Sequence, residues 1–531
     1  MRTRAGAAAA AVTVLCTAFT AVAAAGPARA TGPGLPGLSH GFAPGTLLVS
    51  ESFYQGNPGI VAGQTQLPPG CTTGCVTATA NGSYPQVFNN DLADASFGVT
   101  SRIFLSEMTP AGQRLGTVEV PNGLVTSFSS KSELALNLSP DGRTVSFMGY
   151  VAKPDLLDVS NSNTPGVVDP TNPVPGRFYR AVAQLSGSGR IRLTETNAYS
   201  GNNGRAAITA DTGGKQLIYT AGNAGNGGNP QPDGVILGAG AQLITPGAAP
   251  GAPAPVGSFN ITELGDKADK IGKDDNFRGL TIFNNVLYFT KGSGSNGVNT
   301  VYFLDTTGKA CPNGTGLPAA GAPLPASPLA FNPADLQTTG LPSNMCVLKG
   351  FNTTLAKTTT NVFPFGLWFA NADTLYVADE GNDATTFSGT FSGGTYPAAA
   401  AQTTAGLQKW VFDGTQWKLA YTLQAGLDLG RPYSVRGYPA GNNAATGLPW
   451  APATDGLRNI TGRVNRDGTA TIWAITSTVS GGGDQGADPN KLVEITDPLA
   501  AASPAAGESF RTVQTARFAE VLRGVSFTPA R

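Results

Sequence analysis

The chain has 531 residues, of which 34 are Lys or Arg and 34 are Asp or Glu, so its formal net charge is zero. This balance excludes a general electrostatic affinity for nucleic acid or for anionic membranes. Hydrophobic residues make up 40% of the chain, which excludes an intrinsically disordered composition. The 70 glycines and 39 prolines, together with only 13% charged residues, favour many short strands separated by turns.

Residues 1–30 have the pattern of a secretory signal peptide. Arg2 and Arg4 precede an apolar run from Ala7 to Ala25, and Ala28-Arg29-Ala30 fits a small-x-small cleavage site. An uncleaved membrane anchor is the alternative interpretation. No other stretch approaches the roughly eighteen apolar residues that a membrane span needs. We therefore expect a secreted, extracellular protein with no membrane contact after cleavage, beginning with an irregular, Gly- and Pro-rich lead-in over residues 31–45.

Six short β-hairpins recur along the chain, each with apolar runs that flank turn residues. The five intact copies are Leu134–Gly149, Ala206–Ala221, Arg278–Lys291, Gly366–Asp379 and Asn459–Thr476. The third copy is the clearest, because Asn284 and Asn285 at its turn tolerate the positive φ that a two-residue hairpin loop requires. The sixth copy is split between the chain ends, with its first strand at Gly524–Phe527 and its second at Thr46–Ser50.

Further strands follow each hairpin and complete groups of four. The predicted third and fourth strands are, in chain order, Ser101–Leu105 with Leu115–Val120, Phe178–Leu185 with Ile191–Thr194, Gly234–Ile236 with Asn260–Glu263, Thr300–Leu304 with Cys346–Lys349, Leu407–Phe412 with Lys418–Leu423, and Lys491–Ile495 with Phe510–Val513. Repeats at this spacing are typical of propellers, and a ring of sheets can close by building one sheet from both chain ends. The sequence therefore predicts an all-β, six-bladed β-propeller over residues 46–531, closed by pairing of the N- and C-terminal strands. We expect it to be a monomer.

Two of the hairpins resemble known propeller repeats. Ser139-Pro140-Asp141-Gly142-Arg143 followed by Val145-Ser146-Phe147 resembles the repeat of TolB-type propellers. Pro364-Phe365-Gly366-Leu367 followed by Leu375–Asn382 resembles an NHL-type repeat. Each resemblance covers fewer than about twenty residues and implies the propeller architecture. It does not imply an activity, because these superfamilies include lactonases, lyases, hydrolases and pure binding scaffolds.

Four cysteines follow the predicted cleavage site, namely Cys71, Cys75, Cys311 and Cys346. In an oxidising compartment an even number of cysteines indicates disulfides, and four cysteines allow three pairings. Proximity in sequence favours Cys71–Cys75 within an insertion over residues 56–82, and Cys311–Cys346 around an insertion over residues 308–344. A four-cysteine zinc site is the alternative, which the CxxxC spacing alone supports weakly.

One aligned position just before the first strand of each hairpin suggests a ligand site. Its residues are Glu133, Arg205, Arg278, Phe365, Arg458 and Arg523. Because these strands are expected to be innermost, we expect the side chains to face the mouth of a central funnel. Guanidinium groups bind carboxylates and phosphates through paired hydrogen bonds, so the four arginines and Phe365 are candidate ligand-binding residues for an anionic group. The alternative is that each arginine pairs with a nearby acid, such as Asp274, Asp275, Asp455 or Glu520, and joins adjacent blades.

Candidate catalytic residues come from the same end of the hairpins. The single histidine, His40, lies in the lead-in, which argues against a Ser-His-Asp triad and against histidine-rich metal sites. Acid–base chemistry would then fall to carboxylates, Lys or Tyr. The candidates are Glu51, Glu133, Asp379 and Lys291, with Glu380, Tyr150 and Tyr433 as further possibilities.

Calcium is the one cofactor that the sequence suggests, because the loops supply oxygen ligands and little else. The candidate ligands are Asp379 and Asp383 in the segment DEGND, and Asp484 in DQGADPN. Neither segment has the spacing of an EF-hand, and solvated turn carboxylates are the alternative.

These features together predict an exported propeller that binds an anionic small molecule or glycan in an arginine-lined central funnel. Paired carboxylates could hydrolyse glycosides, and a Tyr or Lys base beside arginines could eliminate from a uronate. The alternative function is that of a non-catalytic propeller at the cell surface that binds or scaffolds other molecules.

Overall fold

The structure is a computed structural model. It describes residues 41–54, 64–67, 72–73, 75–77, 98–121, 123–128, 132–170, 172, 174–223, 240–251, 254–256, 276–292, 297–311, 314–329, 344–356, 362–381, 405–437, 441, 451–478 and 489–531. The fold in this part of the chain is all-β, apart from one short 3-10 helix, η1 (Val159–Asn161). Within the described residues no helix is long and apolar enough to cross a bilayer.

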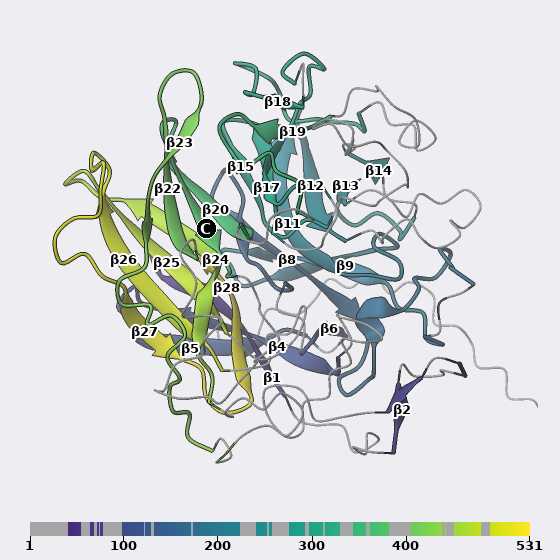
Figure 1. Cartoon of the computed structure of the whole chain (residues 1–531). Helices are drawn as coiled ribbons and strands as arrows, with labels where there is room; N and C mark the ends of the chain where they lie inside the picture. The colour runs from purple at the N-terminus through teal and green to yellow at the C-terminus, as the bar shows by residue number, and fades with distance from the viewer. Residues whose placement is uncertain are drawn as a thin grey trace, which may run out of the picture. The chain divides into compact units, whose positions relative to one another are not determined.

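Three four-stranded sheets and one five-stranded sheet follow one another through the middle and end of the chain (Figure 1). The first comprises β11 (Gly204–Thr212), β12 (Lys215–Gly222), β13 (Ala241–Ile244) and β14 (Ala254–Pro255). The second comprises β15 (Leu280–Phe283), β16 (Val286–Lys291), β17 (Thr300–Leu304), β19 (Met345–Leu348) and β18 (Thr315–Gly316). The third comprises β20 (Pro364–Asn371), β21 (Thr374–Asp379), β22 (Gly406–Phe412) and β23 (Trp417–Leu423). The fourth comprises β24 (Thr454–Val464), β25 (Thr469–Thr478), β26 (Lys491–Pro498) and β27 (Arg511–Thr515).

A nine-stranded sheet combines the start and the end of the chain. One half contains β28 (Glu520–Phe527), β1 (Leu47–Phe53), β4 (Thr100–Met108) and β5 (Arg114–Glu119). The other contains β7 (Asn137–Leu138), β8 (Thr144–Val151), β9 (Arg180–Ser186) and β10 (Ile191–Thr196). The strand β6 (Leu124–Ser127) pairs with both β4 and β8 and so joins the two halves. A separate ribbon is formed by β2 (Gln66–Leu67) and β3 (Val76–Thr77).

The first and last strands pair directly. β1 and β28 are antiparallel, with Leu47 opposite Phe527 and Phe53 opposite Glu520. The chain end also reaches the next group of strands, because the Ala530 backbone N–H donates to the Gly142 carbonyl at 2.7 Å. Residues from the two chain ends therefore share one sheet.

The sheets are arranged as a propeller, with the first strand of each group in contact with the first strands of its neighbours. Five hydrogen bonds and one close backbone approach link these groups in cyclic order. They join Ser50 to Leu134, Asn137 to Ala207, Arg205 to Phe277, Thr290 to Phe365, Gly366 to Arg458, and Val525 to Asn459. We call β28, β7, β11, β15, β20 and β24 the innermost strands.

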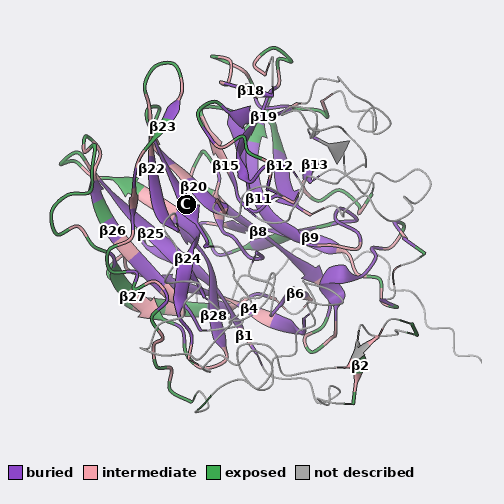
Figure 2. Cartoon of the chain, viewed as in Figure 1, coloured by how far each residue is buried: buried purple, intermediate pink, exposed green. Residues whose placement is uncertain are grey.

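The hydrophobic core lies between neighbouring sheets. One cluster joins β11–β14, β15–β19 and β20–β21, and another packs Trp473 of β25 against Leu47, Val49 and Met108 of β1 and β4. Figure 2 shows that the sheets are buried along most of their length, whereas exposed residues gather at turns and outer strands. The inner strands of the larger sheets are therefore covered by neighbouring sheets, as stacking of sheets around a ring requires.

Most predicted strands are confirmed. The turn between β15 and β16 has φ values of 48° at Asn284 and 61° at Asn285, which is the left-handed conformation expected for this hairpin. The outer strands that the structure describes in the β11 sheet differ from the predicted segments. β13 and β14 occupy those positions, whereas Gly234–Ile236 and Asn260–Glu263 lie outside the described residues.

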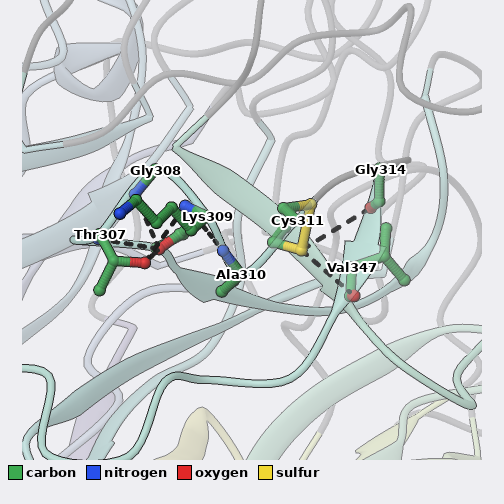
Figure 3. Close-up of a disulfide and its surroundings, with 9 residues drawn as sticks. Thr307, Gly308, Lys309, Ala310, Cys311, Gly314 and Val347 are labelled. Carbon is green, nitrogen blue, oxygen red and sulfur yellow. Dashed lines mark hydrogen bonds between the residues drawn. A yellow bond between two sulfur atoms is a disulfide. The ribbon is translucent and has the colours of Figure 1, made fainter.

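The predicted Cys311–Cys346 disulfide is confirmed, with Cα atoms 5.7 Å apart (Figure 3). It attaches the segment after β17 to β19, where β18 adds a parallel pairing of Thr315 with Val347. Beside it, Asp305 accepts hydrogen bonds from the backbone N–H groups of Thr307 at 2.9 Å and Ala310 at 2.9 Å, which fixes the turn. Cys75 is also disulfide-bonded, but Cys71 lies outside the described residues.

Candidate functional site

The structure places the six aligned residues within or shortly before the innermost strands, and all of them are buried. The exposed fraction is 3% for Arg205 and Arg278, 0% for Arg458 and 1% for Arg523. Phe365 and Glu133 are each 2% exposed. We call the positions of these six residues the entry ring.

Four of the entry-ring residues occupy β-bulges, where the pairing register with the second strand shifts. The shifts fall at Arg205 between β11 and β12, at Phe365 between β20 and β21, at Arg458 between β24 and β25, and at Arg523 between β28 and β1. Arg278 shows a related arrangement. Its backbone N–H donates to the Thr290 carbonyl of β16, and the Thr290 N–H donates to the carbonyl of the next residue, Gly279. A bulge re-aims a side chain away from the regular alternation of a strand. The repeated bulge therefore gives this position a direction that strand alternation alone does not predict.

Two of the ring arginines bridge to the neighbouring sheet. Arg205 Nη1 donates to the Phe277 carbonyl at 3.1 Å and to the Asn276 side chain. Arg523 donates from Nε to Ser52 Oγ at 3.1 Å and from Nη2 to the Phe128 carbonyl. Both arginines thus satisfy backbone carbonyls that precede the next innermost strand. This is the joining role that the sequence left as an alternative, and the partners shown here are backbone carbonyls.

Glu133 lies at the centre of a buried polar cluster. Its Oε2 accepts hydrogen bonds from Thr126 Oγ1 at 2.6 Å and from the Ser127 N–H at 2.9 Å, and its Oε1 accepts from Asn203 Nδ2 at 2.8 Å and from the Tyr150 hydroxyl. Burial raises the pKa of Glu133, and these donors oppose the shift. The structure therefore brings together two residues, Glu133 and Tyr150, that the sequence proposed separately as acid–base candidates.

Arg180 completes this cluster and was missed from the sequence. Its guanidinium carbon lies 5.3 Å from the centre of the Tyr150 ring, and its Nη2 donates to the carbonyls of Ser160 at 2.8 Å and Asn202 at 2.7 Å. Burial lowers the pKa of Arg180 to about 10, while Tyr150 and Glu133 oppose that shift. Burial and then Glu133 raise the pKa of Tyr150 well above its usual range. A lone arginine at the start of an otherwise apolar strand was the signal that could have identified it.

Asp379, at the end of β21, is buried and holds its own backbone turn. Its carboxylate accepts hydrogen bonds from the N–H groups of Gly381 at 3.0 Å and Phe363 at 3.2 Å. Burial raises its pKa to about 6, against the effect of these two donors. The catalytic and metal-binding roles of Asp379 stay predictions, and the other proposed calcium ligands, Asp383 and Asp484, lie outside the described residues.

Glu51 belongs to a different cluster, at the pairing of β1 with β28. Arg114 Nη2 lies 2.9 Å from Glu51 and 3.7 Å from Glu520, so one guanidinium serves two buried carboxylates. Burial and then Glu520 raise the pKa of Glu51 to about 7, and Arg114 opposes this. Lys291, the fourth catalytic candidate, is also buried and donates to Asn299 Oδ1 at 3.0 Å.

Comparisons with known proteins give no family assignment. No family model matches the chain, and no curated protein matches it. Among solved structures, the chain is similar to the hemagglutinin-neuraminidase of parainfluenza virus 5 with the ligand DANA. The TM-score is 0.26 at 10% sequence identity, over 81% of this chain and 84% of the viral chain. The ectodomain of the same viral protein gives a TM-score of 0.26 at 11% identity, over 81% of this chain and 77% of the other.

Proposed function

We propose that this chain is an exported, six-bladed β-propeller that binds an anionic small molecule or glycan at the entry ring. The six linked groups of strands and the pairing of β1 with β28 support six blades closed by both chain ends. The predicted signal peptide supports export, after which the protein would act outside the cell as a monomer.

The observation that carries the binding proposal is the repeated bulge at the entry ring. Arginine occupies bulged or equivalent positions of four innermost strands. Desolvated guanidinium groups keep their charge and bind carboxylates or phosphates through paired hydrogen bonds.

The Glu133 cluster supports a catalytic form of this proposal, as a carbohydrate-active lyase or hydrolase. Burial raises the pKa of the Glu133 carboxyl, which accepts a hydrogen bond from the Tyr150 hydroxyl, so two candidate acid–base groups are in direct contact. Arg180 beside the tyrosine supplies positive charge that would stabilise a developing anion.

A non-catalytic binding or scaffolding propeller is the second candidate. The bonds from Arg205 and Arg523 to backbone carbonyls favour it, because they already give two of the ring arginines a role in joining sheets. In that case the ring would stabilise the scaffold, and loops would contact the partner.

A thermal-shift panel on the purified protein separates the two candidates. The panel contains oligogalacturonate, the matching neutral oligosaccharide, lactones and phosphate monoesters, each with and without a chelator. We expect a carboxylate- or phosphate-bearing compound to raise the melting temperature of the wild type, and Arg278→Gln to remove that shift. Arg192→Gln is the control, because Arg192 is an exposed arginine on the outer strand β10, where its Nη2 donates to the Pro246 carbonyl at 2.9 Å. No shift with any anion, combined with a large loss of stability in Arg278→Gln, would favour the scaffold.

A further inference from the structure

A lysine and a tyrosine outside the entry ring form a second cationic and aromatic pair. Lys491 Nζ lies 4.0 Å from the centre of the Tyr433 ring. Lys491 is partly buried, and in the part of the chain that the structure describes its ammonium group has no hydrogen-bond acceptor and no ion-pair partner. Burial lowers the pKa of Lys491, against the effect of Asp428. The ammonium therefore keeps three donors unused in a partly desolvated position.

The backbone around this pair is held in place. Tyr433 donates from its hydroxyl to the Pro489 carbonyl at 2.7 Å and from its N–H to the Pro452 carbonyl at 2.9 Å. Bridges of Leu429 to Thr454 and of Pro432 to Ala453 fasten the same segment beside the start of β24. The tyrosine ring is therefore held in place, so a ligand that contacts it would meet little ordering cost there.

The strand register places this pair on the same end of the sheet as the entry ring. The Lys491 N–H donates to Thr476 Oγ1 at 3.0 Å, and Thr476 pairs with Leu457, the neighbour of Arg458. Adjacent strands are about 4.8 Å apart, so Lys491 lies two strands, or roughly 10 Å, outward from the ring position on β24. That separation suits a ligand with more than one sugar unit.

We propose that Lys491 and Tyr433 form a second subsite, in which Lys491 binds the carboxylate of an acidic saccharide whose ring contacts Tyr433. Asp428 is exposed and close enough to influence Lys491 without pairing with it, so its carboxylate is available to saccharide hydroxyl groups. The choice of an acidic saccharide as the ligand rests on the proposed function. The observation that the Lys491 ammonium has no hydrogen-bond acceptor among the described residues does not rest on it.

Lysine acylation followed by peptide mass spectrometry tests this subsite, with trigalacturonate as the probe and the matching neutral trisaccharide as its control. We expect trigalacturonate to slow acylation of Lys491 several-fold and to leave Lys418 unchanged. Lys418 is a suitable internal control because its side chain is 61% exposed and it lies on the outer strand β23. Unchanged acylation of Lys491, or equal slowing of both lysines, would overturn the proposal.

Calorimetry with variants gives the second measurement. Lys491→Gln should weaken trigalacturonate binding about tenfold, since one hydrogen bond to a charged group is lost, and Lys491→Arg should retain most of the affinity. Acylation in Arg278→Gln then distinguishes this subsite from the entry ring. If Lys491 stays protected there, the subsite stands while ligand binding at the ring fails. If trigalacturonate no longer protects Lys491 in Arg278→Gln, one ligand contacts both the entry ring and the subsite. That result supports binding at both positions. Full affinity in Lys491→Gln would contradict the subsite.

Discussion

At the scale of single residues, one buried ion pair lies where two sheets meet. Lys409 of β22 lies 2.9 Å from Asp497 of β26, and both side chains are 0% exposed. Tyr421 bonds to both, donating to Asp497 at 2.5 Å and lying 2.9 Å from Lys409 Nζ, and Tyr376 also donates to Asp497. This ion pair is therefore fully hydrogen-bonded, as a buried pair must be to offset its desolvation.

Lys409→Met should lower the free energy of unfolding by about 3–5 kcal/mol, because it leaves the Asp497 carboxylate buried without its cation. Urea denaturation measures this effect. Lys418→Met is the control, since Lys418 forms an exposed pair with Asp413 and its loss should leave the midpoint nearly unchanged. Equal effects of the two substitutions would show that the buried pair has no special role.

The pH dependence of stability should report on Glu51. Its pKa is raised from 4.5 to about 7 by burial and Glu520, so the folded state holds the proton more tightly than the unfolded chain. The resulting stabilisation is present below about pH 4.5 and is lost as the pH rises through about 7. Glu51→Gln should flatten the fall in melting temperature across this window. An unchanged pH profile in the variant would show that Arg114 keeps Glu51 ionised throughout.

At the scale of strands and turns, close approach between innermost strands makes glycine necessary. A Cβ at Gly279 would lie 2.0 Å from the Phe365 carbonyl oxygen of the next sheet. Gly116, on the edge strand β5, has no atom within 4 Å of the same ideal position. The two glycines therefore differ in surroundings, although both lie in or beside strands.

Gly279→Ala should destabilise the protein by about 1–3 kcal/mol, because the innermost strands must move apart to admit a methyl group. Gly116→Ala should be close to neutral. Thermal unfolding of both variants checks this, and equal melting temperatures would contradict the close packing of β15 against β20.

The sequence predicted strands and turns better than it predicted the site. Apolar alternation and the Asn284-Asn285 turn located β15 and β16 correctly, because these signals are local. The alignment also found the entry-ring positions. It did not find that Arg205 and Arg523 would bond to carbonyls of the next sheet, nor that Arg180 would lie against Tyr150, because those partners are distant in sequence and depend on how sheets meet.

At the scale of the whole molecule, the account depends on strands contributed by both chain ends. β28 pairs with β1 on one side and contacts β24 and β7 of the neighbouring groups. Deletion of residues 520–531 should therefore remove the cooperative unfolding transition, because β1 loses its partner and two neighbouring interfaces open. Deletion of Arg531 alone, which is exposed, should change little. A cooperative transition in the longer deletion, seen by calorimetry, would contradict the closing role of β28.

Binding at the entry ring is the central claim, and hydrogen–deuterium exchange with and without oligogalacturonate tests it most directly. The account predicts slower exchange in peptides that contain Phe277–Arg278, Phe363–Phe365 and Asp455–Arg458, and unchanged exchange at the opposite hairpin turns, such as Gly213-Gly214 and Asn284-Asn285. Slower exchange confined to those turns, or no change anywhere at saturating oligogalacturonate, would contradict it.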